Sequence, residues 1–208
     1  MQFSDTKMIF GDLKAALEEL KNNRKVPVAI RRAFGKFLTL TQQLTESMRK
    51  EYKSLTGKEW SASSFTGWNE ITELFKELRR TDYHEFPVVI NVRESQYYIS
   101  EVYEDENGNE LYGYMVPTVT WGLGDPFSEK IPSGMSIVAY DENNQPIDGV
   151  APEKIEYEFI LHPRTTKIET LLKSIGKDDI HELSERCFET LNSYFEFYHS
   201  CIAKDRNR

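Results

Sequence analysis

The sequence predicts an α+β fold in which a mainly helical bundle carries an antiparallel β insertion. Residues 1–86 and 166–203 place apolar side chains at helical spacing, whereas residues 88–162 are rich in β-branched and aromatic residues and in turn dipeptides. The insertion therefore falls between the third helix and the C-terminal helices. With 208 residues, the chain has the length of one large domain or two small ones, and we expect a single domain over 1–208.

The N-terminal part of the chain is expected to form three amphipathic helices. Pro27 suits the first turn of the second helix, and Gly57 follows its end. Thr66 is the expected cap of the third helix. The expected helices cover, in order, residues 4–22, 27–55 and 66–80. The apolar stripe of the first consists of Met8, Ile9, Leu13, Ala16, Leu17 and Leu20.

The insertion reads as short strands separated by turns. Asn107-Gly108 is a dipeptide typical of tight hairpins, and the strand that follows it is the expected return strand. Alternation of apolar and polar residues predicts a half-buried last strand with Ile155, Tyr157, Phe159 and Leu161 on its apolar face. The expected strands cover residues 88–92, 96–103, 111–120, 136–140 and 154–161.

Two further helices are expected after the insertion. A short helix over residues 168–175 is stopped by Gly176. Either Asp178 or Asp179 then caps a long closing helix. Its apolar stripe is Leu183, Cys187, Leu191, Tyr194, Tyr198 and Cys201.

Charge is unevenly distributed along the chain, which has a formal net charge of −8 and a pI of about 5.2. Residues 1–84 contain 15 Lys and Arg against 11 Asp and Glu, whereas residues 85–165 contain 4 against 15. This balance argues against RNA binding on the insertion, because phosphates are repelled by carboxylates. The helical face remains open to RNA.

Composition also bears on compartment and cofactors. The first twenty residues are too charged for a signal peptide, and no apolar run is long enough to span a membrane, so we expect a cytoplasmic chain without a membrane segment. Cys187 and Cys201 stand fourteen residues apart on one helical stripe, which predicts two buried thiols and no disulfide. The histidines lack metal-ligand spacing, so neither a metal nor another cofactor is expected.

The strongest candidate site lies at the end of the third predicted helix. Arg79 and His84 are separated by four residues, just before the break marked by Pro87. A guanidinium group can clamp a phosphate and stabilise charge that develops on it, and an imidazole can move a proton near neutral pH. Together they suit metal-free cleavage of an RNA phosphodiester, provided that a break in the helix brings His84 beside Arg79.

The arrangement resembles the HEPN superfamily of small helical bundles, whose signature is an arginine, usually followed by a polar residue, and then a histidine after four to six positions. Here the signature is Arg79 to His84, with Arg80 in the polar position. The resemblance covers the helical parts only and leaves the insertion outside the common bundle.

The resemblance implies an RNA-acting protein, and specifically a metal-independent endoribonuclease of the kind found in toxin and anti-phage systems. By that resemblance Arg79 contacts the phosphate, His84 is the acid and base, and two copies of the motif meet across a homodimer. Arg80, Asp82 and Tyr83 are then the candidate substrate-binding residues.

Two other interpretations remain open on the residues alone. The basic side chains of the motif are also placed where positive charge stabilises a helix C-terminus, which needs no substrate. In addition, the acidic insertion carries aromatic residues along its hairpin, and it is a candidate surface for a protein partner. On this second interpretation the chain is a non-catalytic interaction protein.

Overall fold

The structure is a computed structural model that describes residues 5–84, 88–123, 139–140, 146–147 and 151–206. It confirms the α+β, mainly helical fold. The chain divides into two compact units, which we call the helical unit (Met1–Ile90 and Ile160–Arg208) and the β unit (Asn91–Phe159). That both belong to one domain stays a prediction.

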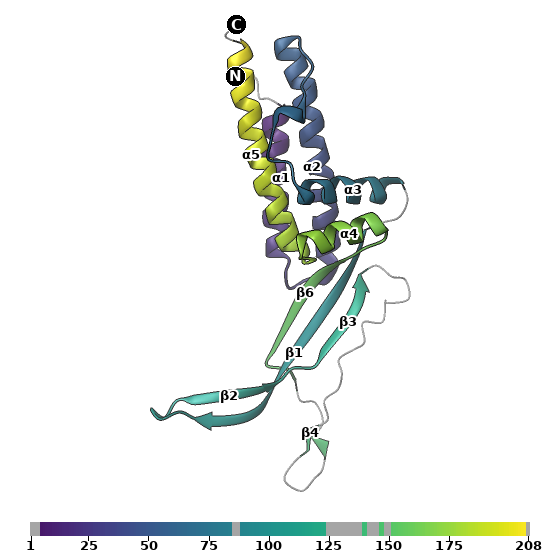
Figure 1. Cartoon of the computed structure of the whole chain (residues 1–208). Coiled ribbons are helices and arrows are strands. Elements are labelled where there is room, and N and C mark those ends of the chain that lie inside the picture. The colour runs from purple at the N-terminus through teal and green to yellow at the C-terminus, as the bar shows by residue number, and fades with distance from the viewer. Residues whose placement is uncertain (1–4, 85–87, 124–138, 141–145, 148–150, 207–208) are drawn as a thin grey trace. The chain divides into compact units, whose positions relative to one another are not determined.

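The helical unit is assembled from the two ends of the chain (Figure 1). Within it α1, α2 and α5 pack against one another, and α3 packs against α2, α4 and α5. A short 3₁₀ helix, Ala62–Ser64, precedes α3. The helices are α1 (Asp5–Asn22), α2 (Pro27–Thr56), α3 (Glu70–His84), α4 (Thr166–Ile175) and α5 (Ile180–Arg206).

Most helix ends follow the expected signals. Gly57 and Gly176 adopt φ values of 70° and 71° after α2 and α4, a left-handed conformation that glycine reaches without a steric penalty. Thr165 caps α4 through its side-chain oxygen. Asp179 caps α5, because its Oδ1 accepts the N–H groups of His181 and Glu182 at 3.0 and 2.9 Å.

The start of α3 differs from the prediction. The cap is Asn69 and not Thr66: its Oδ1 accepts the N–H of Thr72 at 3.2 Å. A Cβ on Gly67 would lie 2.4 Å from Cζ of Phe65, so the chain passes close over that ring before the helix begins. Trp68 consequently lies outside the helix with 36% of its surface exposed.

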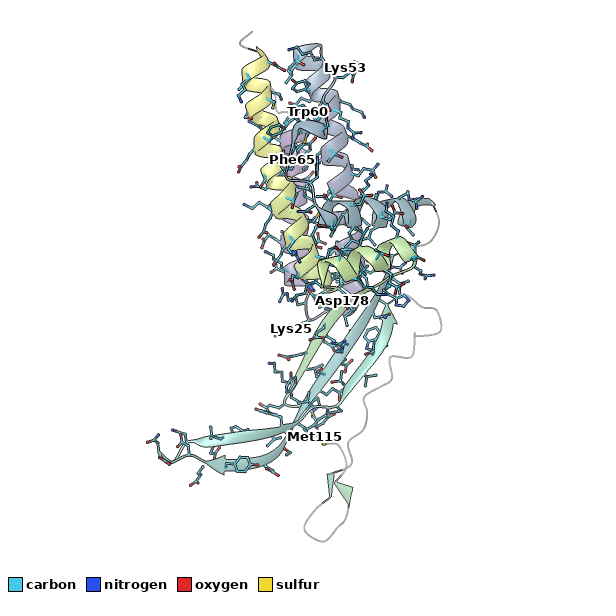
Figure 2. The ribbon with its side chains drawn as sticks, in the orientation of Figure 1. Lys25, Lys53, Trp60, Phe65, Met115 and Asp178 are labelled. Carbon is cyan, nitrogen blue, oxygen red and sulfur yellow. The ribbon has the colours of Figure 1, made fainter. Side chains whose placement is uncertain are left out.

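Aromatic side chains fill much of the core of the helical unit. Phe75 of α3 meets Phe34 and Phe37 of α2 edge to face, with ring centroids 6.0 and 5.8 Å apart. Trp60 lies between α2 and α5, where its ring meets Tyr198 edge to face at 5.2 Å (Figure 2). Met8, which the spacing places in the α1 stripe, is instead 49% exposed.

The β unit is built around one long strand. Strand β1 pairs with β2 and β3 along one of its edges and with β6 along the other. It covers both of the first two predicted strands, while the predicted return strand is divided at Pro117, which lacks an N–H group. The strands are β1 (Val89–Glu104), β2 (Glu110–Met115), β3 (Thr118–Leu123), β4 (Ala139–Tyr140), β5 (Pro146–Ile147) and β6 (Lys154–His162).

The remaining strands are short or end in the helical unit. Strands β4 and β5 form a separate antiparallel pair, and residues 136–138 of the predicted strand lie outside the described part of the chain. The last strand is buried at Phe159 and Leu161, as its alternation predicts, whereas Ile155 on the same predicted face is 39% exposed. At its end the Leu161 N–H donates to the Asp178 carbonyl at 2.8 Å, which ties the strand to the turn before α5.

Candidate functional site

The Arg79–His84 motif lies entirely within α3, which continues to His84 instead of ending near Arg80. The expected break between Arg79 and His84 is therefore wrong. On a continuous helix, positions five apart lie about 140° apart around the axis, whereas positions four apart share a face. Position 84 thus shares its face with Arg80 and not with Arg79.

The two arginines of the motif have different environments. Arg79 is half-buried, with a buried Nε atom. Arg80 is exposed and donates from its Nε atom to Oε1 of Glu77 at 3.0 Å. The side chains of Asp82, Tyr83 and His84 lie outside the described part of the structure.

A buried carboxylate organises the charges beside the motif. Glu77 is only 3% exposed, and its Oε2 accepts a hydrogen bond from Nζ of Lys167 at 2.9 Å, while Arg80 holds its other oxygen. Lys167 also bonds Glu73 at 2.9 Å. Burial acts to raise the pKa of Glu77, but the hydrogen bonds from Lys167 and Arg80 outweigh it and keep the pKa below 4.5.

This cluster of four charged residues joins α3 to α4 across ninety positions of sequence. Sequence reasoning places Arg80 in the polar slot of the motif but misses its partner Glu77. The spacing of three residues between them on one helix is a signal that was available. No local signal in the sequence points to Lys167, because it is distant from α3 along the chain and only the folded structure brings the two together.

Other polar groups of the helical unit are explained by packing. His181 is buried and lies 3.2 Å from the Leu20 carbonyl through its Nε2 atom. Cys187 is buried, and burial raises the pKa of its thiol strongly. Cys201 is a free thiol that is only partly buried, in contrast to the expectation of two buried thiols. Across the described ranges, no group of three or more His, Cys, Asp or Glu side chains is placed to hold a metal ion.

A pocket of about 290 Å³ lies between the end of α2 and the end of α5. Two of its polar residues pair with each other: Tyr52 donates its hydroxyl hydrogen to Asp205, which raises the pKa of Tyr52 to about 12. Lys58, outside the lining, lies 3.3 Å from Asp205. The thiol of Cys201 also lines the pocket. The lining contains neither an arginine nor a histidine, the two side chains expected to act on RNA at the Arg79–His84 motif.

A second candidate surface lies in the β unit. We call the hairpin over residues 98–115 the ribbon; it joins the outer half of β1 to β2 and extends beyond the sheet made with β3 and β6 (Figure 1). Its loop is closed by Asp105, whose Oδ1 accepts the N–H groups of Asn107 and Asn109 at 2.8 Å each. Gly108 takes φ 80° there. Met115 marks the end of the ribbon nearest the sheet (Figure 2).

Seven large apolar side chains of the ribbon are between 44% and 56% exposed. The register sets Ile99 opposite Tyr114 and Val102 opposite Tyr112, and these four positions share one face. On the other face the ring of Tyr103 lies over Gly113, where a Cβ would be 3.5 Å from it. The seven are Ile99, Val102, Tyr103, Leu111, Tyr112, Tyr114 and Met115.

The ribbon is also strongly acidic. Residues 96–118 contain five Asp or Glu and no Lys or Arg. Glu104 and Glu110 stand directly opposite each other in the register, a placement that costs free energy because like charges repel. The aromatic residues and the negative charge of the ribbon can be read from the sequence. The exposure of both faces of the hairpin cannot.

Among the described helices, none has an apolar stretch long enough to cross a membrane. Comparisons with protein-family models, with curated proteins and with solved structures found no match to this chain.

Proposed function

We propose that this chain is an interaction protein that binds a protein partner through the ribbon of its β unit. The observation that carries the proposal is the continuous set of exposed apolar side chains on the two strands, with cross-strand pairs such as Val102 and Tyr112. Single exposed apolar residues are ordinary, but a contiguous patch marks a surface that another molecule covers.

The energetics of a two-stranded hairpin support the same conclusion. An isolated hairpin is marginally stable in water, because it buries little apolar surface on either face. Every residue of β1 from Ile99 to Glu104 is exposed. A partner that covers these side chains would remove apolar area from water, at about 25 cal/mol per Å².

Photo-crosslinking tests this proposal. A benzophenone amino acid replaces Tyr112 of the full chain in its host cell, and a matched probe replaces the exposed Glu189 of α5. We expect a discrete protein adduct from the first position, identified by mass spectrometry, and its loss when Val102→Glu is added. Equal adducts from both positions, or none from position 112, would reject a ribbon interface.

The second candidate function is a metal-independent endoribonuclease in a HEPN-like bundle. It is favoured by the position of the motif at the end of a bundle helix, with Arg79 and Arg80 in the last turns of α3. Because positions 79 and 84 lie on different faces of this helix, the function requires a second copy of the motif to place a histidine beside Arg79. In this function Arg79 binds the phosphate, His84 transfers the proton, and a homodimer brings two motifs together. The ion pair of Arg80 with Glu77 leaves that arginine less available to RNA.

RNA cleavage in EDTA tests the second function. We expect the wild-type chain to cut single-stranded RNA, His84→Ala to abolish the cutting, and His162→Ala, at an exposed position on β6, to retain it. Cleavage that survives His84→Ala removes this mechanism, and the absence of cleavage of any RNA tested leaves the interaction function alone.

A further inference from the structure

The ribbon has strand edges that no described strand covers. Among the described strands, β2 pairs with β1 alone. On the other side of β1, the Glu153 N–H donates to the Tyr97 carbonyl at 2.8 Å and β6 begins at Lys154, so pairing among the described residues stops where the ribbon starts. Unpaired N–H and C=O groups along a strand are a template for another strand.

Of the two edges, that of β2 is the regular one. The register of β1 shifts between Ile99 and Glu101, and such a bulge interrupts the even spacing of main-chain groups that strand pairing needs. Strand β2 has no residue inserted over the same span. It therefore offers the better template.

The closing bond of the loop shows which groups of β2 point outward. The Asp105 N–H donates to the Asn109 carbonyl at 2.9 Å, and facing residues of an antiparallel pair alternate between bonded and non-bonded positions. Glu110, Tyr112 and Tyr114 consequently direct their main-chain groups away from β1. Six extended residues span about 20 Å, enough to hold a partner strand of similar length.

Charge selects the kind of strand that fits. Glu104 and Glu110 face each other beside the β2 edge, and a cation placed between them would relieve their repulsion. A second copy of the ribbon would instead add five more carboxylates, and a nucleic acid would add phosphates. The apolar side chains on both faces call for apolar residues between the cations.

We infer that the edge of β2 binds an extended segment of a partner protein in which Lys or Arg alternate with apolar residues. The segment adds as a further strand, its amide groups bond the outward groups of Glu110, Tyr112 and Tyr114, and its cations lie beside Glu104 and Glu110. This inference rests on the proposed interaction function and names the chemistry of the partner.

Fluorescence anisotropy with the full chain tests the inference, with a labelled peptide of alternating Lys and Val as the probe. Its controls are a peptide of alternating Glu and Val and a Lys/Val peptide with a central Pro, which cannot continue a strand. We expect the probe to bind at least about tenfold more tightly than either control. Equal binding of the Glu/Val peptide, or of the Pro peptide, overturns the inference.

Two variants locate the site. Tyr112→Pro removes one outward N–H, together with the hydroxyl that donates to Glu110, while sparing the main-chain bonds to β1. Glu104→Lys with Glu110→Lys reverses the charge. We expect both to weaken probe binding at least about tenfold, whereas Glu189→Lys with Glu196→Lys on α5 leaves it unchanged. Undiminished binding to either ribbon variant overturns the inference.

Failure of the inference is distinguishable from failure of the proposed function. If no peptide binds while the probe amino acid at position 112 still gives a discrete adduct, the ribbon is an interface for a different chemistry. If sedimentation instead shows a dimer of this chain that Tyr112→Pro dissociates, the occupant is a second copy and the inference is wrong.

Discussion

At the scale of single residues, Glu77 decides the electrostatics at the end of α3. Arg80 and Lys167 stabilise its buried carboxylate by supplying charge and hydrogen bonds to both oxygens. A buried ion loses the solvation of water, and these two partners offset that cost. Arg80, which belongs to the candidate RNA motif, thereby has a structural task that does not depend on any substrate.

Replacing that carboxylate should destabilise the helical unit. Glu77→Gln removes charge-assisted hydrogen bonds from a buried position, and we expect the free energy of unfolding to fall by about 1–3 kcal/mol in urea titrations. Glu70→Gln, at an exposed position in the first turn of α3, is the matched control and should change it little. A loss as small as that of the control would show that the cluster contributes nothing to stability.

The same cluster predicts a dependence of stability on pH. Lys167 keeps the pKa of Glu73 below 4.5, and the pKa of Glu77 is also lowered. Because the folded-state pKa values lie below the unfolded ones, the stabilisation is complete above about pH 4.5 and is lost as the pH falls through the folded values. Thermal melts should show a smaller drop in Tm below about pH 4.5 for Glu77→Gln than for the wild type; parallel curves would contradict this.

At the scale of elements, local signals predict ends well where the signal and its partner are neighbours. Gly57, Gly176 and Asp179 act within one turn of their helices. Both glycines are predictable, while the sequence leaves Asp178 and Asp179 as alternative caps of α5. The start of α3 was not predictable: Gly67 lies against the Phe65 ring, a contact that the sequence does not reveal, and the helix is capped only at Asn69. Where two residues three positions apart could each cap the same helix, packing of this kind determines which of them does.

The far end of α3 was missed for a related reason. Arg80 looks like the last residue of a helix because polar residues follow it, yet Thr81 is 2% exposed and the helix continues to His84. A buried threonine among charged residues has no pattern that periodicity detects. This affects the candidate site, because the continuous helix places positions 79 and 84 on different faces of α3.

The loop of the ribbon depends on one aspartate. Asp105→Ala removes the acceptors of the Asn107 and Asn109 N–H groups and of the Asn109 side chain, so we expect faster amide exchange at these two positions and along β2. Hydrogen exchange followed by NMR measures this, with Asp12→Ala on α1 as the control. Unchanged exchange in the loop would mean that the backbone bonds suffice.

At the scale of the whole molecule, the two units have different sequence signatures, and this is why the fold class was predictable. Helical spacing in residues 1–84 and alternation in β6 each follow from burial on one side. The exposed faces of the ribbon were not predictable, because aromatic residues such as Tyr112 and Tyr114 usually indicate a buried strand. The pattern of apolar residues alone does not show whether the chain itself or another molecule covers those side chains.

The helical unit should fold without the β unit. In a variant whose residues 91–159 are replaced by a short Gly-Ser linker, we expect a helical circular-dichroism spectrum and a single cooperative thermal transition, because the cores of α1, α2 and α5 lie within that unit. The full chain is the control. A helical signal that melts gradually would show that the β unit is needed to order the bundle.

The assembly of the helical unit from both chain ends has a consequence for synthesis on the ribosome. When Ile90 has been made, α1, α2 and α3 exist without α4 and α5, and the 118 residues up to Arg208 are still to come. At about 5–20 residues per second, the wait lasts on the order of 6–24 s. During that interval the rings of Phe10 and Trp60 lack the aromatic contacts that α5 supplies in the finished fold, so we expect chaperones that hold apolar helices to bind the nascent chain.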